Sequence, residues 1–134
     1  MIFKFKSTFF STLIVLSGVA NAAANMQEIE TKTELGWDVI ALHRVCAKYD
    51  ESSGHDLIAV NAEASLFRYV RLSKLVKNTY PEVHTRKVWL REQVNSAAYS
   101  YQEQTESRAA VIAECKKQIK HSKEFVKSLG LPPE

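Results

Sequence analysis

The sequence predicts an all-α fold, a four-helix antiparallel bundle tied by one disulfide bond. Apolar residues between Met26 and Leu129 recur at steps of three and four, which is the spacing of one face of a helix. Turn signals are rare in this stretch, and the one turn-rich segment is 50–56. No segment alternates Val, Ile and Thr between hairpin turns, so β-strands are not expected.

The first 22 residues have the pattern of an export signal. Lys4 and Lys6 precede an apolar run over Phe9–Val19, and 20–22 reads Ala-Asn-Ala, the small-x-small form of a cleavage site. The run is roughly 11 residues, whereas a membrane-spanning helix needs about 20. We therefore expect cleavage, a single exported domain over 23–134, and no stable membrane insertion. The lack of any Asn-x-Ser/Thr sequon favours the bacterial periplasm.

The charge balance excludes one class of partner. The whole chain carries a formal net charge of +3. Without the two lysines of the signal, 16 basic residues face 15 acidic ones, a net charge of about +1. Nucleic-acid-binding domains need a clear surplus of Lys and Arg to displace the counterions of phosphate, so no nucleic-acid partner is expected.

The first helix is expected over Met26–Tyr49. Its apolar stripe consists of Leu35, Val39, Leu42, Val45 and Tyr49. Acidic residues gather in its first half, where the helix dipole favours them: Glu28, Glu30, Glu34 and Asp38. The helix should end at the turn-rich segment 50–56.

Asp56 is placed to cap the second helix, because its side chain can accept hydrogen bonds from the first free N–H groups. The expected apolar stripe of this helix is Val60, Ala64, Phe67, Val70 and Leu75. Pro81 should end it and start the next, since proline disfavours helical geometry at the preceding residue and fits a first turn.

The segment from Glu82 to Leu129 contains no proline or glycine, so it could form one helix of about 50 residues or two shorter ones. Average helix length favours two. The polar run 102–107 is the expected break, with Thr105 or Ser107 as a cap. The prediction is therefore four helices of a little over 20 residues each, with three helices, one of them very long, as the alternative.

Cys46 and Cys115 are the two cysteines of the chain, and an even count in an exported protein indicates a disulfide. In an up-down bundle the first and fourth helices are antiparallel neighbours. Cys46 then lies near the end of the first helix and Cys115 near the start of the fourth, at the same pole. The bond would close a loop of about 70 residues, for which chain entropy gives roughly 4 kcal/mol.

Residues that could carry catalysis or hold a metal do not form a recognisable motif. His43, Cys46, Cys115 and His121 could form a Cys₂His₂ zinc site only if both thiols stayed free. Met26 and His121 are the one pair that could ligate a b-type haem between the first and last helices. We expect no catalytic residues, no metal and no cofactor.

Two groups of side chains could mark an interaction surface. Basic stripes are expected on the second helix, at Arg68, Arg71, Lys74 and Lys77, and on the last, at Lys116, Lys117, Lys120, Lys123 and Lys127. These read mainly as solvated faces. The aromatic residues Trp37, Trp89, Tyr99, Tyr101 and Phe125 are expected in the core, and any that is exposed would be an interface anchor.

Two short patches, Leu42–Cys46 and Cys115–Phe125, together with the distance between them, resemble the periplasmic immunity proteins that protect bacteria from type VI secretion amidases. Those proteins are small, exported and helical, with one cysteine in an early helix and one in a late helix. The resemblance implies a non-enzymatic homodimer that plugs the active-site cleft of a peptidoglycan hydrolase effector.

The residues themselves favour a binding protein over a catalyst, because the predicted scaffold is stapled and lacks catalytic groups. The candidate partner-binding loop consists of Asp50, Glu51, Ser52, Ser53, Gly54, His55 and Asp56, and its side chains are expected to be exposed. Because its ends are fixed, it could enter a cleft at modest entropic cost. The alternatives are a periplasmic chaperone or envelope-stress protein, and a haem or metal carrier.

Overall fold

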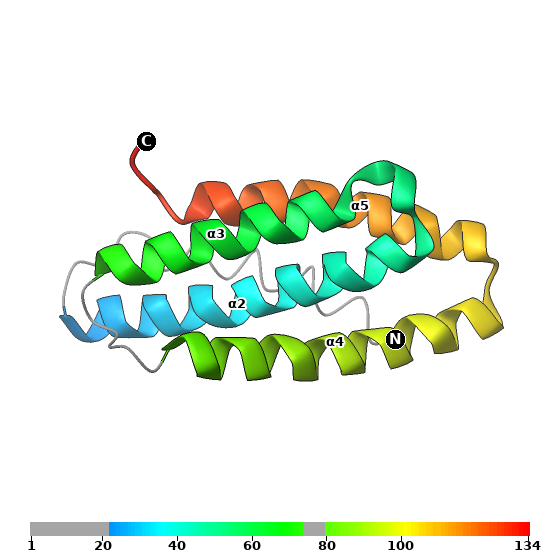
Figure 1. Ribbon diagram of the computed structural model, residues 1–134, viewed down its shortest axis with the longest axis horizontal. Helices are drawn as coiled ribbons and strands as arrows, with labels where there is room; N and C mark the ends of the chain where they lie inside the picture. Colours follow the sequence, from blue (N-terminus) through cyan, green and yellow to red (C-terminus); the bar gives the residue numbers. More distant parts are fainter. Residues whose placement is uncertain (1–21, 74–79) are drawn as a thin grey trace.

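The computed structural model describes residues 22–73 and 80–134, and within them the predicted all-α fold is confirmed. The helices are α2 (Ala22–Tyr49), α3 (His55–Ser73), α4 (Tyr80–Thr105) and α5 (Arg108–Ser128), with a short 3₁₀ turn, η1 (Glu51–Ser53), between α2 and α3. Successive helices run in opposite directions along the long axis of the molecule (Figure 1). The predicted signal segment up to residue 21 lies outside the described residues.

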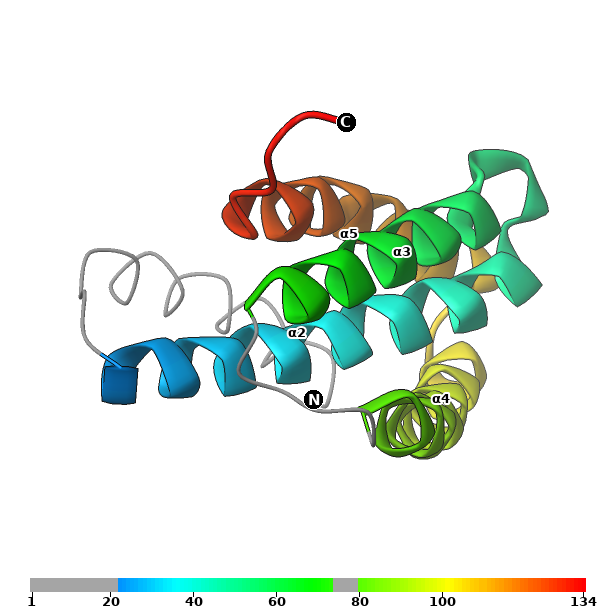
Figure 2. The ribbon, with the colours of Figure 1, turned by 60° about the vertical axis from the view of Figure 1, so that its left-hand side comes forward.

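Helix α2 lies at the centre of the arrangement and contacts α3, α4 and α5. Figure 2 shows α3 and α5 above α2, with α4 below it. From Leu35 to Cys46, every residue of α2 except Arg44 is buried. A helix that is buried all round needs neighbours on every side. Helix α4 packs mainly on α2, so much of its own circumference remains exposed.

Two groups of buried apolar residues hold the helices together. The larger joins α2, α3, α4 and α5 and contains Leu35, Trp37, Val39, Ile40, Ala41, Ala62, Leu66, Val70, Val88, Phe125 and Leu129. The smaller surrounds the disulfide and contains Leu42, Val45, Cys46, Ala98, Tyr99, Val111 and Cys115. The stripe predicted for the first helix is thus buried, with Tyr49 half-buried.

The predicted stripe of the second helix is only partly correct. Val60 is 58% exposed and Ala64 is exposed, whereas Ala59, Ala62, Leu66 and Val70 are buried. Compared with the predicted stripe, the buried face of α3 is shifted around the helix, because His55, its first residue, is buried against α2. Asp56 lies inside the first turn instead of capping it. Leu75 lies outside the described residues.

The chain from Pro81 onward forms two helices, as the break at 102–107 predicts. Pro81 lies in the first turn of α4, and α4 ends at Thr105. Ser107 caps α5, because its hydroxyl accepts a hydrogen bond from the backbone N–H of Ala110 at 3.2 Å. Gly130, in the left-handed region with φ of 61°, follows the end of α5.

Among the described helices, none combines the length and the apolar character that crossing a membrane requires.

Candidate functional site: the turn between α2 and α3

The disulfide predicted between α2 and α5 is present and fastens the pole at which the candidate loop lies. Cys46 and Cys115 are bonded, with their Cα atoms 5.7 Å apart. Both sulfurs are buried and no described cysteine is free. Because both cysteines are bonded, neither offers a thiolate. A Cys₂His₂ zinc site would lack its sulfur ligands, and a catalytic cysteine would lack its nucleophile.

The turn itself is closed by the backbone and by one carboxylate. The N–H of Asp50 donates to the carbonyl of Cys46 at 2.9 Å. The side chain of Asp50 accepts hydrogen bonds from the hydroxyls of Ser53 and Ser52, which lower its pKa. Gly54 then reverses the chain with φ of 71°, a conformation in which a side chain would be strained.

Two buried histidines hold the far end of the turn against α2. Nδ1 of His43 and Nδ1 of His55 are 2.8 Å apart, and the rings stack with their centroids 5.1 Å apart. One nitrogen must donate and the other accept, so at least one ring is neutral. Burial lowers the pKa of His43 to about 4, helped by the neighbouring His55, and burial also lowers the pKa of His55.

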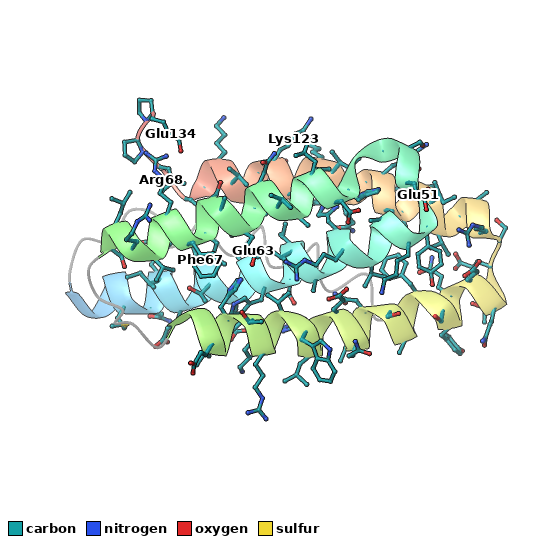
Figure 3. The ribbon with its side chains drawn as sticks, in the orientation of Figure 1. Glu51, Glu63, Phe67, Arg68, Lys123 and Glu134 are labelled. Atoms are coloured by element: carbon teal, nitrogen blue, oxygen red, sulfur yellow. A yellow bond between two sulfur atoms is a disulfide. The ribbon has the colours of Figure 1, made fainter. Side chains whose placement is uncertain are left out.

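The turn therefore contains two kinds of residue: buried residues that fix its shape and exposed residues that face solvent. The expectation that all its side chains are exposed is wrong for Asp50 and His55, because one ties the turn to itself and the other packs on α2. The exposed residues are Glu51, Ser52, Gly54 and Asp56, and Ser53 is half-buried. Figure 3 labels Glu51 at the turn between α2 and α3.

Leu57, in the first turn of α3, is 64% exposed and extends this surface. The sequence pattern does not mark Leu57 as exposed, because an apolar residue beside a helix start is normally assigned to the core. The turn thus presents two carboxylates and one large apolar side chain on a fixed backbone.

A second buried polar group joins α2, α3 and α4 and was not foreseen. The indole N–H of Trp37 donates to Nδ1 of His84, whose Nε2 lies 3.7 Å from Glu63. Glu63 also accepts from Arg44 at 2.7 Å. Figure 3 shows Glu63 and Phe67 extending from α3 toward the other helices, and Phe67 contacts the ring of His84 at its edge. The members of this group bind one another and so connect the three helices.

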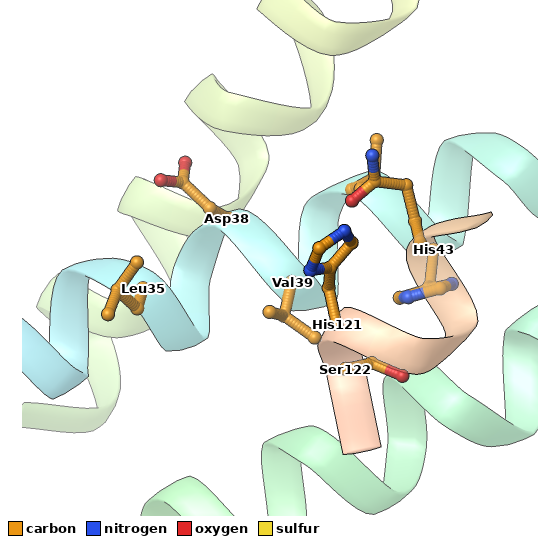
Figure 4. Close-up of a pocket in the computed structure, with 8 residues that line it drawn as sticks. Leu35, Asp38, Val39, His43, His121 and Ser122 are labelled. Carbon is orange, nitrogen blue, oxygen red and sulfur yellow. The ribbon is translucent and has the colours of Figure 1, made fainter. Parts of the chain in front are cut away.

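A pocket between α2 and α5 is shown in Figure 4. It is lined by Leu35, Asp38, Val39, Leu42, His43, Gln118, His121 and Ser122. Three of its polar residues have partners: Asp38 accepts from Arg91, Gln118 donates to Glu114, and Ser122 donates to the carbonyl of Ile119.

The structure does not assemble the haem ligands that the sequence suggested. His121 lines the pocket beside Asp38, whereas Met26 lies twelve residues earlier on α2, about 18 Å along the helix. Within the described residues, no group of three or more His, Cys, Asp or Glu side chains is arranged to hold a metal ion.

The basic stripe of α5 lies on the outer face of the molecule. All five predicted lysines are exposed, and Figure 3 shows Lys123 pointing away from the core. Two of them form ion pairs along the helix, Lys117 with Glu114 and Lys120 with Glu124. Arg68 lies near Glu134 of the C-terminal segment, Arg71 is exposed, and Lys74 and Lys77 lie outside the described residues.

The fold and the site define a disulfide-tied helical bundle with a fixed, exposed turn. Comparison of the chain with protein-family models, with curated proteins and with solved structures finds no match.

Proposed function

We propose that this protein is a non-catalytic periplasmic binding protein, an immunity or inhibitor protein that neutralises a secreted cell-wall amidase. The observation that carries the proposal is the construction of the α2–α3 turn. Its anchors are buried and bonded, while Glu51, Asp56 and Leu57 project from it. A segment already fixed in shape loses little conformational entropy on entering a cleft. The resemblance of the two cysteine-bearing patches to amidase immunity proteins supports the same reading.

The test is inhibition of the hydrolase encoded beside this protein's gene. We expect the purified protein to bind that hydrolase and to stop its release of fragments from purified peptidoglycan. Replacing Glu51, Asp56 and Leu57 together with alanine should weaken binding at least 100-fold, because the central contacts of an interface carry most of its free energy. His55 must remain in this variant, since it is part of the fold.

The matched control replaces Glu82, Glu124 and Leu72 with alanine, two exposed acidic residues and one half-exposed leucine away from the turn. Both variants should keep the thermal midpoint of the parent. Calorimetric titration measures the affinities. An unchanged affinity in the turn variant would remove the turn from the mechanism and direct attention to the lysines of α5.

A second candidate is a periplasmic chaperone, and one observation favours it. Helix α4 exposes Val83, Trp89, Leu90, Val94 and Tyr101, which is an unusual concentration of apolar surface. A chaperone would use this surface for unfolded clients. Suppression of the aggregation of a reduced, unfolded protein, lost in Val94→Glu, would support this candidate over the inhibitor.

A further inference from the structure

Positive charge is concentrated on helix α5. Six basic and two acidic residues lie on this helix, so it carries a net charge of +4. The rest of the segment 23–134 contains ten basic and 13 acidic residues, a net charge of −3. The near-neutral charge of the expected exported domain therefore combines one cationic helix with a remainder that is anionic on average.

The lysines of α5 lie on the face of the helix that is turned away from the core. Gln118 and Phe125 are buried, and Lys120 and Lys127 each follow one of them by two residues, which is more than half a helical turn. Figure 3 shows Lys123 pointing away from the core. All five lysines are exposed, and together they form the α5 lysine face: Lys116, Lys117, Lys120, Lys123 and Lys127.

The two glutamates of α5 engage this face only weakly. Lys117 lies 3.7 Å from Glu114, and Lys120 lies 4.0 Å from Glu124. The two lysine side chains nevertheless remain 73% and 82% exposed. Ion pairs this open to water contribute little and are screened by salt, so both ammonium groups can still meet another anion.

The other three lysines of the face are less engaged within the chain. Lys116 interacts electrostatically with Asp50 of the α2–α3 turn. Among the residues that the structure describes, no carboxylate forms an ion pair with Lys123 or Lys127. The half of the face farther from the turn is therefore the more available half.

The chemistry of the face indicates what kind of partner it fits. None of the large apolar side chains exposed on the described part of the molecule belongs to α5. Protein interfaces depend on aromatic, apolar and arginine anchors near their centre, and lysine is depleted there. An anionic lipid surface needs no such anchor, because it attracts every lysine that lies close to it. A convex row of lysines therefore fits a lipid surface better than a protein.

We propose that the α5 lysine face adsorbs this protein on the anionic phospholipid surface of a membrane, on which it lies without inserting. The face extends over about 16 Å from Lys116 to Lys127. Each lysine held near such a surface raises the partition coefficient about fivefold. Figure 2 shows α4 on the other side of α2 from α5, so the exposed apolar side chains of α4 would face away from the lipid.

Vesicle binding tests the proposal. The purified protein should co-sediment with vesicles of phosphatidylcholine mixed with phosphatidylglycerol, and it should stay in solution with vesicles of phosphatidylcholine alone. Binding should be lost when the salt concentration rises from about 0.1 M to about 1 M, because the Debye length falls from about 10 Å to about 3 Å. Equal binding to both kinds of vesicle would assign adsorption to apolar side chains and overturn the proposal.

The triple variant Lys120→Gln, Lys123→Gln and Lys127→Gln should lower the partition coefficient on the anionic vesicles about 100-fold. Arginine at the same three positions keeps the charge and should keep the binding. Loss of binding in the arginine variant too would indicate a site that depends on the shape of lysine, which a lipid surface does not, and would overturn the proposal.

The matched control removes three positive charges from the other side of the molecule. It carries Lys48→Gln, Arg86→Gln and Lys87→Gln, at exposed positions of α2 and α4. Its net charge equals that of the α5 glutamine variant, yet it should bind the anionic vesicles like the parent. Circular dichroism and the thermal midpoint should match the parent in all these variants. Equal loss of binding in the control would show that net charge alone acts, without a defined face.

A fluorescent label tests the orientation. Ala113 and Gln93 are exposed on α5 and α4, and each can be replaced by cysteine and labelled under non-reducing conditions. Anionic vesicles should shield the label at Ala113→Cys from acrylamide and leave the label at Gln93→Cys accessible. Shielding of the α4 label instead would overturn the proposal.

Absence of binding to anionic vesicles at low salt would also overturn it. If the α5 glutamine variant lost affinity for the hydrolase while the parent ignored vesicles, the lysines would belong to a protein interface instead. The inference does not depend on amidase inhibition, because no hydrolase is present in the vesicle measurements. Failure of one proposal therefore leaves the other standing.

Discussion

Gly36 lies in the middle of α2, where a glycine normally weakens a helix. Its lack of a side chain lets α3 and α5 approach α2 closely. A Cβ atom at this position would collide with the side chain of Leu66 and would lie 3.1 Å from Cζ of Phe125. Both neighbours are buried and packed, so they have little room to move.

We expect Gly36→Ala to lower the free energy of unfolding by about 1–2 kcal/mol, because overpacking costs more here than the gain of about 1 kcal/mol in helix propensity. Urea unfolding followed by circular dichroism measures the change. Combining Gly36→Ala with Leu66→Ala should relieve part of the clash, but the double variant also loses the core packing of the leucine. A stabilised Gly36→Ala protein would show that Leu66 can rotate away.

At the scale of the elements, α2 and α3 are joined by the buried pair His43 and His55. Burial is the largest cause of the lowered pKa of each ring. Around them, the carboxylates of Asp50 and Asp56 raise the pKa of His55 and Lys116 lowers it, while the backbone of Gln118 raises that of His43. The pair is therefore held neutral in the folded state near pH 7.

We expect the free energy of unfolding to fall as the pH falls from about 6.5 to about 4. The unfolded chain takes up protons near pH 6.5, whereas folded His43 does so only near pH 4, so the unfolded state binds more protons across this window. The difference corresponds to about 3 kcal/mol for His43. Urea midpoints measured at pH 7.5, 6 and 5 give the slope.

His43→Gln removes the titrating ring and keeps a side chain that can hydrogen-bond, so it should flatten this pH dependence although it lowers stability at pH 7.5. An equally steep decline in the variant would assign the acid sensitivity to other groups, with His84 the next candidate, because burial lowers its pKa too.

At the scale of the whole molecule, the disulfide connects the central helix to the last one across 69 residues of sequence. In the chain-entropy model, a loop of this length stabilises the fold by about 4 kcal/mol. Helix α5 also packs on α2 and α3, so its position does not depend on the bond alone.

We expect Cys46→Ala with Cys115→Ala to remain helical at 25 °C and to lose about 2–4 kcal/mol of unfolding free energy. The parent protein treated with a reductant should show the same loss, which separates the effect of the bond from that of the alanines. Urea unfolding measures both. Equal midpoints with and without the bond would mean that packing around Val45 and Val111 fixes α5 by itself.

The sequence alone was sufficient for the helices and for the disulfide. Pro81 and Ser107 act through local backbone chemistry, so they marked the start of α4 and of α5 directly. The disulfide was predicted from the two cysteines of the chain, and the order and direction of the helices placed both at the same pole. Periodicity also identified Leu35, Val39, Leu42 and Val45 of α2 as buried, although it did not show that α2 is buried all round.

The tertiary structure decided which faces and which turn residues are exposed. His55 is a polar residue in a turn, and only its contact with His43, twelve residues away, shows that it is buried. On α4, the polar Asn95 is buried and the apolar Leu90 is 44% exposed, because this helix packs mainly on α2 and that contact decides which of its side chains are covered. Exposure is a property of contacts between elements distant in sequence, so a pattern within one helix cannot determine it.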